Sequence, residues 1–127
     1  MYSHITIGIT DFDRAAAFYD PVMATLGHER FFAGDGFCAY GKPGDNQFWI
    51  LPPHDKQPAS AGNGSHTAFL APDRTTVRAF HAAALANGGT DEGAPGPRPH
   101  YHANYYGAYV RDPDGNKIQA VCHRAED

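Results

Sequence analysis

The chain has 127 residues, a length that fits one domain, and 42% of them are hydrophobic, enough to build a core. A formal net charge of −4 and the lack of any basic run argue against nucleic acid as a partner. The two cysteines match no zinc motif or disulfide framework, no apolar run approaches the roughly 18 residues of a membrane helix, and the first residues do not resemble a signal peptide. We therefore expect a cytoplasmic protein without a membrane partner.

An internal repeat is the strongest organising feature of the sequence. When the chain is aligned with itself at one constant offset, a histidine, an aspartate, a phenylalanine and a glycine recur in the same order. The matching pairs are His4 and His66, Asp11 and Asp73, Phe18 and Phe80, and Gly27 and Gly89. Such self-similarity indicates two copies of one supersecondary unit.

The first copy begins with a strand at His4, followed by a helix that starts after Asp11 and ends at Gly27. Aspartate is a good N-cap residue, and glycine suits the left-handed turn at a helix C-terminus. Pro21 lies inside this helix and predicts a kink or an early stop. Three strands follow, at about residues 29–32, 37–40 and 47–51.

The segment 53–63 is rich in Pro, Gly, Ser and Asn and is predicted to be a linker. The second copy repeats the strand at His66 and the helix after Asp73, and then has strands at about 90–92, 107–111 and 117–122. The segment 93–104 contains three prolines and several His and Tyr residues. We predict an irregular loop there, of the kind that often carries function. Cys38 and Cys122 are predicted to be buried thiols.

Two turn segments, 42–46 and 112–116, separate the last two strands of each copy, and their alignment matches Trp49 with Gln119. The predicted fold is α+β, in one domain spanning 1–127: two βαβββ modules, about 1–52 and 64–123, pair into one curved mixed sheet around a cavity, with the helices outside. Pseudo-symmetry should then gather four side chains in the cavity, namely His4, Trp49, His66 and Gln119.

The sequence resembles the vicinal oxygen chelate superfamily of glyoxalases, bleomycin resistance proteins and extradiol dioxygenases. The resemblance rests on the histidine that opens each module and on the terminal motif Asp112-Pro113-Asp114-Gly115-Asn116-Lys117-Ile118-Gln119, and it covers nearly the whole chain. The stretch 98–107 is similar to one glyoxalase-like branch. In the metal enzymes of this superfamily, a divalent ion binds both first-strand histidines and a last-strand carboxylate.

By position, this resemblance implies His4, His66 and Gln119 as metal ligands, with one Zn, Ni, Mn or Fe ion. The sequence departs from the metal-binding pattern at two positions. Gln119 replaces a glutamate, so the site loses one negative charge, and Trp49 occupies the position of a further ligand but cannot bind a metal. Gln119 also cannot serve as the base that the glutamate provides in isomerases.

Two functions remain open at this point. One is a metal-dependent lyase, isomerase or dioxygenase that acts on a small oxygen-rich substrate. The other is a metal-free protein of the bleomycin-resistance type that binds a small drug or metabolite in an aromatic crevice. No catalytic residue is identified. The residues expected to contact a ligand are Trp49, His100, Tyr101, His102, Tyr105 and Tyr106.

Two further expectations concern partners. Arg98 and Arg111 are candidates for recognising an anionic substrate, with a solvated surface position as the alternative. We also expect a homodimer, because pairing of the modules, within one chain or between two, leaves sheet edges that association covers.

Overall fold

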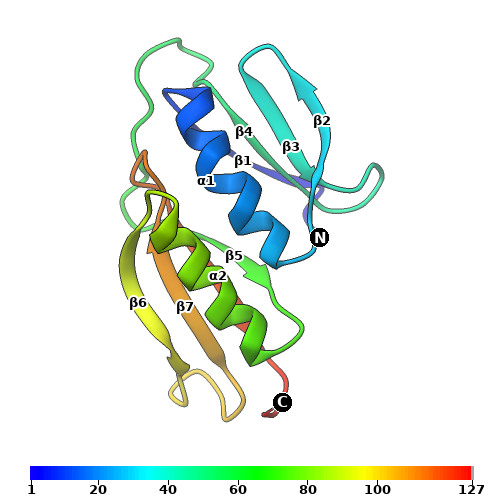
Figure 1. Cartoon of the computed structure of the whole chain (residues 1–127), viewed down its shortest axis with the longest axis vertical. Helices are drawn as coiled ribbons and strands as arrows, with labels where there is room; N and C mark the ends of the chain where they lie inside the picture. Colours follow the sequence, from blue (N-terminus) through cyan, green and yellow to red (C-terminus); the bar gives the residue numbers. More distant parts are fainter. Residues whose placement is uncertain (127) are drawn as a thin grey trace.

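The computed structural model describes residues 1–126 and contains two modules with the same order of elements (Figure 1). The first module consists of β1 (His4–Gly8), α1 (Phe12–Thr25), β2 (Arg30–Gly34), β3 (Phe37–Gly41) and β4 (Gln47–Leu51). The second consists of β5 (Thr67–Leu70), α2 (Arg74–Ala86), β6 (Thr90–Pro97), β7 (Tyr106–Arg111) and β8 (Lys117–Cys122). The predicted α+β class and βαβββ repeat are confirmed.

Each module has its own four-stranded mixed sheet, with strand orders β1-β4-β3-β2 and β5-β8-β7-β6. The first strand of each module pairs in parallel with the last, and the other pairings are antiparallel. No hydrogen-bonded ladder joins the two sheets within residues 1–126. The arrangement is therefore two adjacent sheets and not a closed barrel.

The helix boundaries follow the predicted caps. The Asp11 carboxylate accepts a hydrogen bond from Arg14 N at 3.1 Å, and Asp73 accepts one from Thr76 N at 2.7 Å. Gly27 has a φ of 81°, as the left-handed turn after α1 requires. The early stop that Pro21 predicted does not occur, since α1 continues to Thr25. Buried residues on both sides of the proline hold this helix by packing, which outweighs the lost hydrogen bond.

Strand β6 extends five residues beyond its predicted end, into the proline-rich segment. It is the outermost strand of its sheet, where a missing N–H is tolerated because it faces no neighbouring strand. Its pairing with β7 shifts register around Gly93 and Gly96, as expected of β-bulges. Only the remainder of the segment, between β6 and β7, forms the predicted loop.

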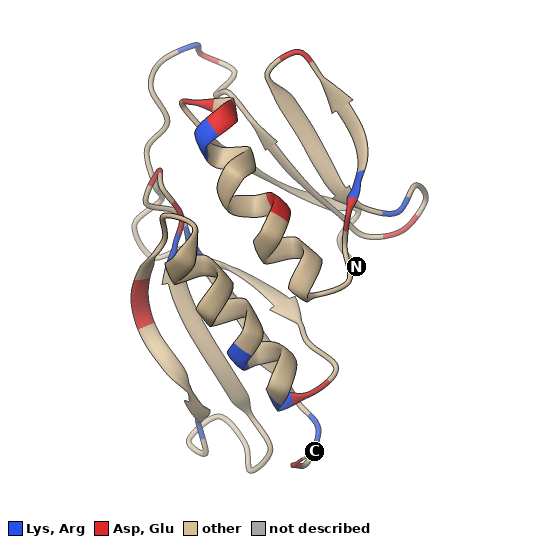
Figure 2. Cartoon of the chain, viewed as in Figure 1, with Lys and Arg blue, Asp and Glu red and all other residues tan. Residues whose placement is uncertain are grey.

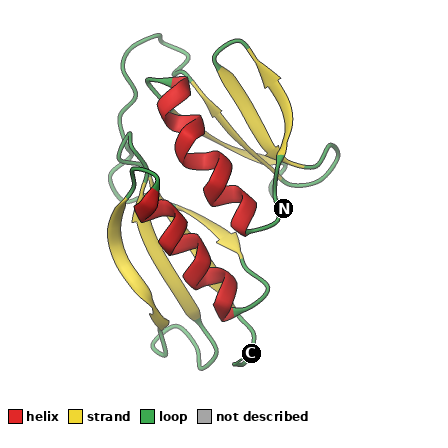
Figure 3. Ribbon diagram, viewed as in Figure 1, coloured by secondary structure: helices red, strands yellow, loops and turns green. Residues whose placement is uncertain are grey.

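The helices α1 and α2 lie side by side (Figure 3). One hydrophobic core includes residues of both modules. The rings of Phe48 and Phe69 meet edge to face in this core at 4.9 Å. Ile5 packs against the core, as does Ile118 on β8. Because side chains alternate along a strand, His4 and Gln119 point away from the helices, each on the helix-free face of its own sheet.

The turn at 112–116 connects the two modules through polar contacts. Asp112 is 4% exposed, and its burial raises the pKa of its carboxyl despite bonds from Tyr19 and Asn116. The bonds that cross between modules are Tyr19 Oη to Asp112 Oδ2 (2.6 Å), Thr10 N to Asp114 Oδ1 (3.1 Å), Arg14 Nη2 to Asp114 Oδ1 (3.0 Å) and Asn116 Nδ2 to Gly8 O (3.0 Å). From the sequence, this turn was expected only to separate the last two strands of the second module.

Other predictions concern thiols and membrane segments. Cys38 and Cys122 are both buried free thiols, as predicted. Among the described residues, no helix has the length and apolar character needed to cross a bilayer. Lys, Arg, Asp and Glu are dispersed over both modules (Figure 2).

Candidate functional site

A chain of three hydrogen-bonded side chains lies on the second module's sheet face opposite the helices. His66 directly precedes β5, and its Nε2 is 3.1 Å from Gln119 Oε1. Gln119, only 1% exposed, donates from Nε2 to the Tyr105 hydroxyl at 2.6 Å. An amide oxygen can only accept, so His66 Nε2 carries the proton in this arrangement and Nδ1 is left as an acceptor.

Tyr109 adds a second aromatic hydroxyl to this face, since it lies directly opposite Gln119 in the β7–β8 ladder. Its ring meets the His66 ring at 5.7 Å in an edge-to-face contact. Burial, reinforced by a hydrogen bond with Tyr105, raises the pKa of Tyr109. The hydroxyl therefore stays protonated at neutral pH and suits hydrogen bonding to a ligand better than acting as a base.

The loop after β6 forms an aromatic wall at one end of this face. The Tyr101 ring lies 4.2 Å from the His100 ring and 4.8 Å from the Tyr105 ring. His102 Nε2 lies 2.9 Å from Nδ1 of His123, which follows β8. Four of the six expected ligand-contacting residues are thus grouped here, together with His123, which was not predicted from the sequence.

Tyr106 lies on the other face of the sheet. It is 8% exposed, and its hydroxyl accepts a hydrogen bond from Arg78 of α2 at 3.2 Å. Strand alternation explains the difference, because Tyr105 and Tyr106 are neighbours and must point in opposite directions. Tyr109, by contrast, was missed although it has the right parity along β7 to share a face with Tyr105 and Gln119.

The equivalent face of the first module is apolar. Trp49 on β4 contacts three phenylalanine rings at centroid distances of 6.0, 5.8 and 6.3 Å, those of Phe31, Phe32 and Phe37. Its indole nitrogen donates to Gln47 Oε1 at 3.0 Å. The two pseudo-equivalent positions therefore differ in chemistry: Trp49 belongs to an aromatic cluster, and Gln119 to a polar network.

The described contacts do not join His4 to His66 or Gln119. His4 is exposed at the start of β1, and its ring nitrogen lies 2.9 Å from the Ser3 hydroxyl. Asn116, next to the start of β8, bonds to Gly8 at the opposite end of β1. Because β8 is parallel to β5, the end of β1, and not its start, lies at the His66 end of the second sheet. His4 is four residues further back, roughly 13 Å along the strand.

The side chains on this face do not fit a divalent metal site within one chain. His66 Nε2 is engaged with Gln119, so within this arrangement only its Nδ1 has a lone pair for a metal. Gln119 supplies no carboxylate, and Trp49 has no metal-binding atom. Within residues 1–126, no three His, Cys, Asp or Glu side chains are grouped as a metal would require.

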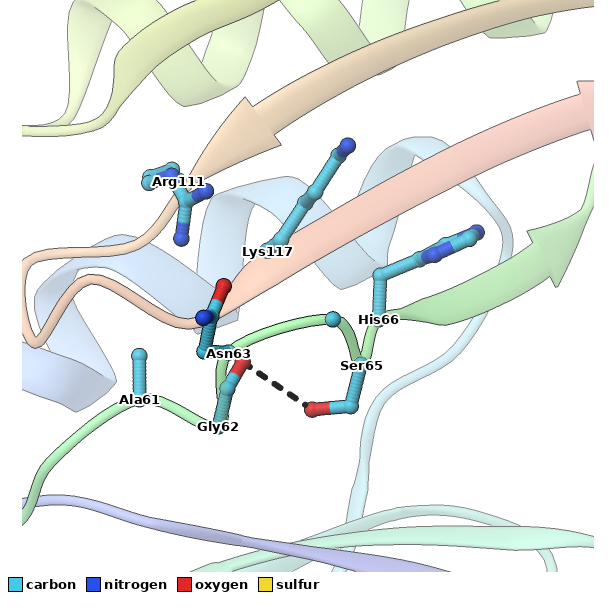
Figure 4. Close-up of a pocket in the computed structure, with 8 residues that line it drawn as sticks. Ala61, Gly62, Asn63, Ser65, His66, Arg111 and Lys117 are labelled. Atoms are coloured by element: carbon cyan, nitrogen blue, oxygen red, sulfur yellow. Dashed lines mark hydrogen bonds between the residues drawn. The ribbon is translucent and has the colours of Figure 1, made fainter.

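A cavity of about 400 Å³ adjoins the polar network (Figure 4). Its walls are the glycine-rich segment 61–66, which ends at His66, and the side chains of Arg111 and Lys117 from β7 and β8. A smaller cavity of about 220 Å³ shares His66 and Lys117 and extends to Ile5–Ile7 of β1. The first volume is within the range of small-molecule sites. Lys117, which was not predicted from the sequence, is common to both cavities.

Comparisons with known proteins agree with the fold. Residues 2–120 match the family model described as Glyoxalase/Bleomycin resistance protein/Dioxygenase superfamily. A crystal structure of a glyoxalase/bleomycin resistance protein from Albidiferax ferrireducens T118 is 42% identical in sequence, with a TM-score of 0.90 over 96% of this chain and 98% of that chain. No curated protein matches the sequence.

More distant structures share the fold alone. A glyoxalase-related enzyme from Fulvimarina pelagi has 22% identity and a TM-score of 0.75, covering 96% of this chain and 87% of that chain. A lactoylglutathione lyase from Agrobacterium tumefaciens has 23% identity and a TM-score of 0.67, covering 96% and 92%.

Proposed function

The chain belongs to the glyoxalase/bleomycin resistance/dioxygenase superfamily, and on that premise we propose that it binds a small organic molecule without a resident metal ion, as bleomycin resistance proteins do. The observation that carries this proposal is the state of Gln119. Its amide is almost fully buried, and both ends of the amide are hydrogen-bonded, to His66 and to Tyr105. Gln119 thus positions the His66 and Tyr105 side chains, and it supplies no negative charge to a divalent cation.

The chemistry of the two sheet faces suits a ligand with an aromatic part and a polar part. The Trp49 cluster offers flat apolar surface on which a ring can stack. His66 Nδ1 and the tyrosine hydroxyls offer hydrogen bonds of defined direction. We include Trp49, His100, Tyr101, His102 and Tyr105 among the ligand contacts, add Tyr109, and omit Tyr106 because it faces α2.

We further propose that the protein acts as a homodimer. Leu70 is 71% exposed and Phe32 is 49% exposed, so both large apolar side chains are open to contact with a partner. Leu70 alternates with Phe69 of the core and therefore lies on the face away from the helices. A second chain that covers this face would bury both residues, and sedimentation should find a dimer at micromolar concentration. Leu70→Asp should shift it to a monomer, whereas Leu85→Asp on α2, also exposed, should not.

A divalent-metal enzyme is the second candidate function, and it rests on the position of His66 next to Gln119. In that case His66 and Gln119, with His4 of the same or a second chain, would hold one Zn, Ni, Mn or Fe ion. When bound, such an ion would polarise two neighbouring oxygens of a substrate, as in a lyase or dioxygenase. His66 would bind the ion through Nδ1, or through Nε2 after that nitrogen gives up its hydrogen bond to Gln119.

Metal content separates the two candidates. For metal-free binding, we expect elemental analysis of the untagged protein to find far less than one equivalent of divalent metal; a near-stoichiometric amount would overturn the proposal. The enzyme hypothesis makes a further prediction: Gln119→Glu restores a carboxylate and should tighten Zn²⁺, Ni²⁺ or Mn²⁺ binding in calorimetry. That gain should disappear in a His66→Ala background. Equal affinity of wild type and Gln119→Glu would favour the metal-free protein.

A further inference from the structure

The cavity beside His66 gathers basic side chains. Arg111 and Lys117 are directly opposite each other in the β7–β8 ladder, so their side chains share one face. Figure 4 shows both above the segment 61–66, with the Asn63 side chain reaching toward them. His66 is the third basic residue there, and none of the described residues that line the cavity is acidic. This concentration of positive charge stands out in a chain whose net charge is −4.

Arg111 and Lys117 carry like charges, and like charges directly opposite each other destabilise a β-ladder unless a negative group lies nearby. Arg111 has such a partner, because its Nε donates to Glu92 at 2.7 Å while its Nη1 donates to Gly115 O at 2.9 Å. Lys117 has none: among the described residues it forms no ion pair with a carboxylate, and its ammonium lies 5.0 Å from the Tyr109 ring centre. Arg111 is thus held in position, and Lys117 is a cation that lacks a counter-charge.

The segment opposite these cations presents backbone to the cavity. Gly62 and Gly64 have no side chains, and Gly64 has a φ of 97°. The Ser65 hydroxyl donates to Gly62 O at 3.3 Å and closes a tight turn. Within the described residues, the amides of Asn63 and Gly64 donate no backbone hydrogen bond. Successive free amides in a turn favour an anion.

We propose that this cavity binds the anionic group, a phosphate or a carboxylate, of the protein's small-molecule ligand. The inference rests on the proposed function and narrows the ligand class to small anions. Lys117 supplies the unpaired charge, Arg111 a fixed guanidinium, and the segment 62–65 neutral donors. The aromatic and hydroxyl groups around Tyr109 and Tyr105 then contact the rest of the ligand.

Titration with inorganic phosphate, followed by NMR of the backbone amides and by calorimetry, tests the proposal. We expect saturable shifts centred on Asn63, Gly64 and Lys117. Lys117→Gln should weaken phosphate binding about tenfold, as expected for the loss of one charge-assisted bond. Lys117→Arg should keep most of the affinity. Lys42→Gln removes the same charge from the exposed turn of the first module and should have no effect. Acetate in place of phosphate distinguishes a carboxylate site from a phosphate site.

Two results would overturn the inference: shifts that do not saturate or spread over the whole surface, and equal affinity in wild type and Lys117→Gln. Circular dichroism checks that the variant is folded. If it is not, Asn63→Ala provides a second test, with a loss of affinity expected. The outcome is separable from that of the proposed function, because stoichiometric metal in the purified protein would refute metal-free binding and leave phosphate binding at Lys117 intact.

Discussion

The two hairpin turns, 42–46 and 112–116, occupy equivalent places in the repeat but make different contacts. In the first, Asp45 accepts from the neighbouring Asn46 amide at 2.8 Å, and the turn is exposed. In the second, Asp112 is buried and accepts from the Tyr19 hydroxyl of the other module at 2.6 Å. The same turn chemistry therefore closes a hairpin in one module and joins two modules in the other.

This difference identifies the turn whose contacts stabilise the packing of the two modules against each other. Asp112 accepts four hydrogen bonds, two of them from backbone amides of its own turn and two from side chains, one of which is Tyr19 of α1. Removing such a buried acceptor leaves several donors without partners, whereas an exposed acceptor is replaced by water. The repeat thus specifies two hairpins, and burial decides which of them also holds the modules together.

The largest effect is expected from Asp112→Ala, which removes the acceptor that joins the modules. We expect the free energy of unfolding to fall by about 3 kcal/mol, because the Tyr19 hydroxyl and the amides of the turn become buried and unsatisfied. Urea unfolding followed by circular dichroism measures this. The matched change Asp45→Ala should cost less than about 1 kcal/mol. Equal losses in both variants would contradict the distinction between the turns.

A smaller effect is expected from Tyr19→Phe, which removes only the donor of the inter-module bond. The Asp112 carboxylate keeps its other three bonds, so the loss should be about 1–2 kcal/mol in urea unfolding. Tyr40→Phe is the control in the first module, since Tyr40 donates at 2.7 Å to the exposed Asp20, which water can solvate. If Tyr40→Phe lowered the free energy of unfolding by more than Tyr19→Phe, this prediction would be wrong.

The smallest change in stability is expected from the charged side-chain pairs that connect each helix to a strand of its own sheet. In the first module, Asp20 of α1 accepts two hydrogen bonds from Arg30 of β2, at 2.8 and 2.6 Å. The second module reverses the charges, with His81 of α2 bonded to Asp91 of β6 at 2.8 Å. Partial burial raises the pKa of Asp20, but bonds from Arg30 and Tyr40 outweigh it and the net pKa is lowered.

A carboxyl whose pKa is lowered by folding stabilises the protein above its unfolded-state pKa, and this stabilisation is lost as pH falls through the folded-state pKa. Asp20→Asn should therefore lower the free energy of unfolding by about 0.5–1 kcal/mol at neutral pH, and the difference should shrink below about pH 4. Urea unfolding at several pH values measures it. A stability difference between wild type and Asp20→Asn that grows toward low pH would contradict this prediction. Asp91→Asn should change stability less, since the Asp91 side chain is more exposed than that of Asp20.

Much of the fold could be predicted from the sequence, because the signals are local. Asp11 and Asp73 cap helices wherever the helices pack, and Gly27 suits a left-handed turn whatever surrounds it. The repeat then placed Trp49 and Gln119 at equivalent positions of β4 and β8. The length of β6 was missed because prolines are excluded from central strands but not from an edge strand, and strand order is not a local property.

The composition of the candidate site was decided only by tertiary structure. The sequence predicted that His66 and Gln119 lie together and placed Tyr105 in a different group, among the ligand contacts. The hydrogen-bonded chain of all three depends on the pairing of β5 with β8 and on the path of the loop before β7. Ladder register likewise sets Lys117 opposite Arg111, next to a glycine-rich segment some 50 residues earlier in the chain. Residue type and periodicity determine which face a side chain takes; long-range pairing determines which other side chains share that face.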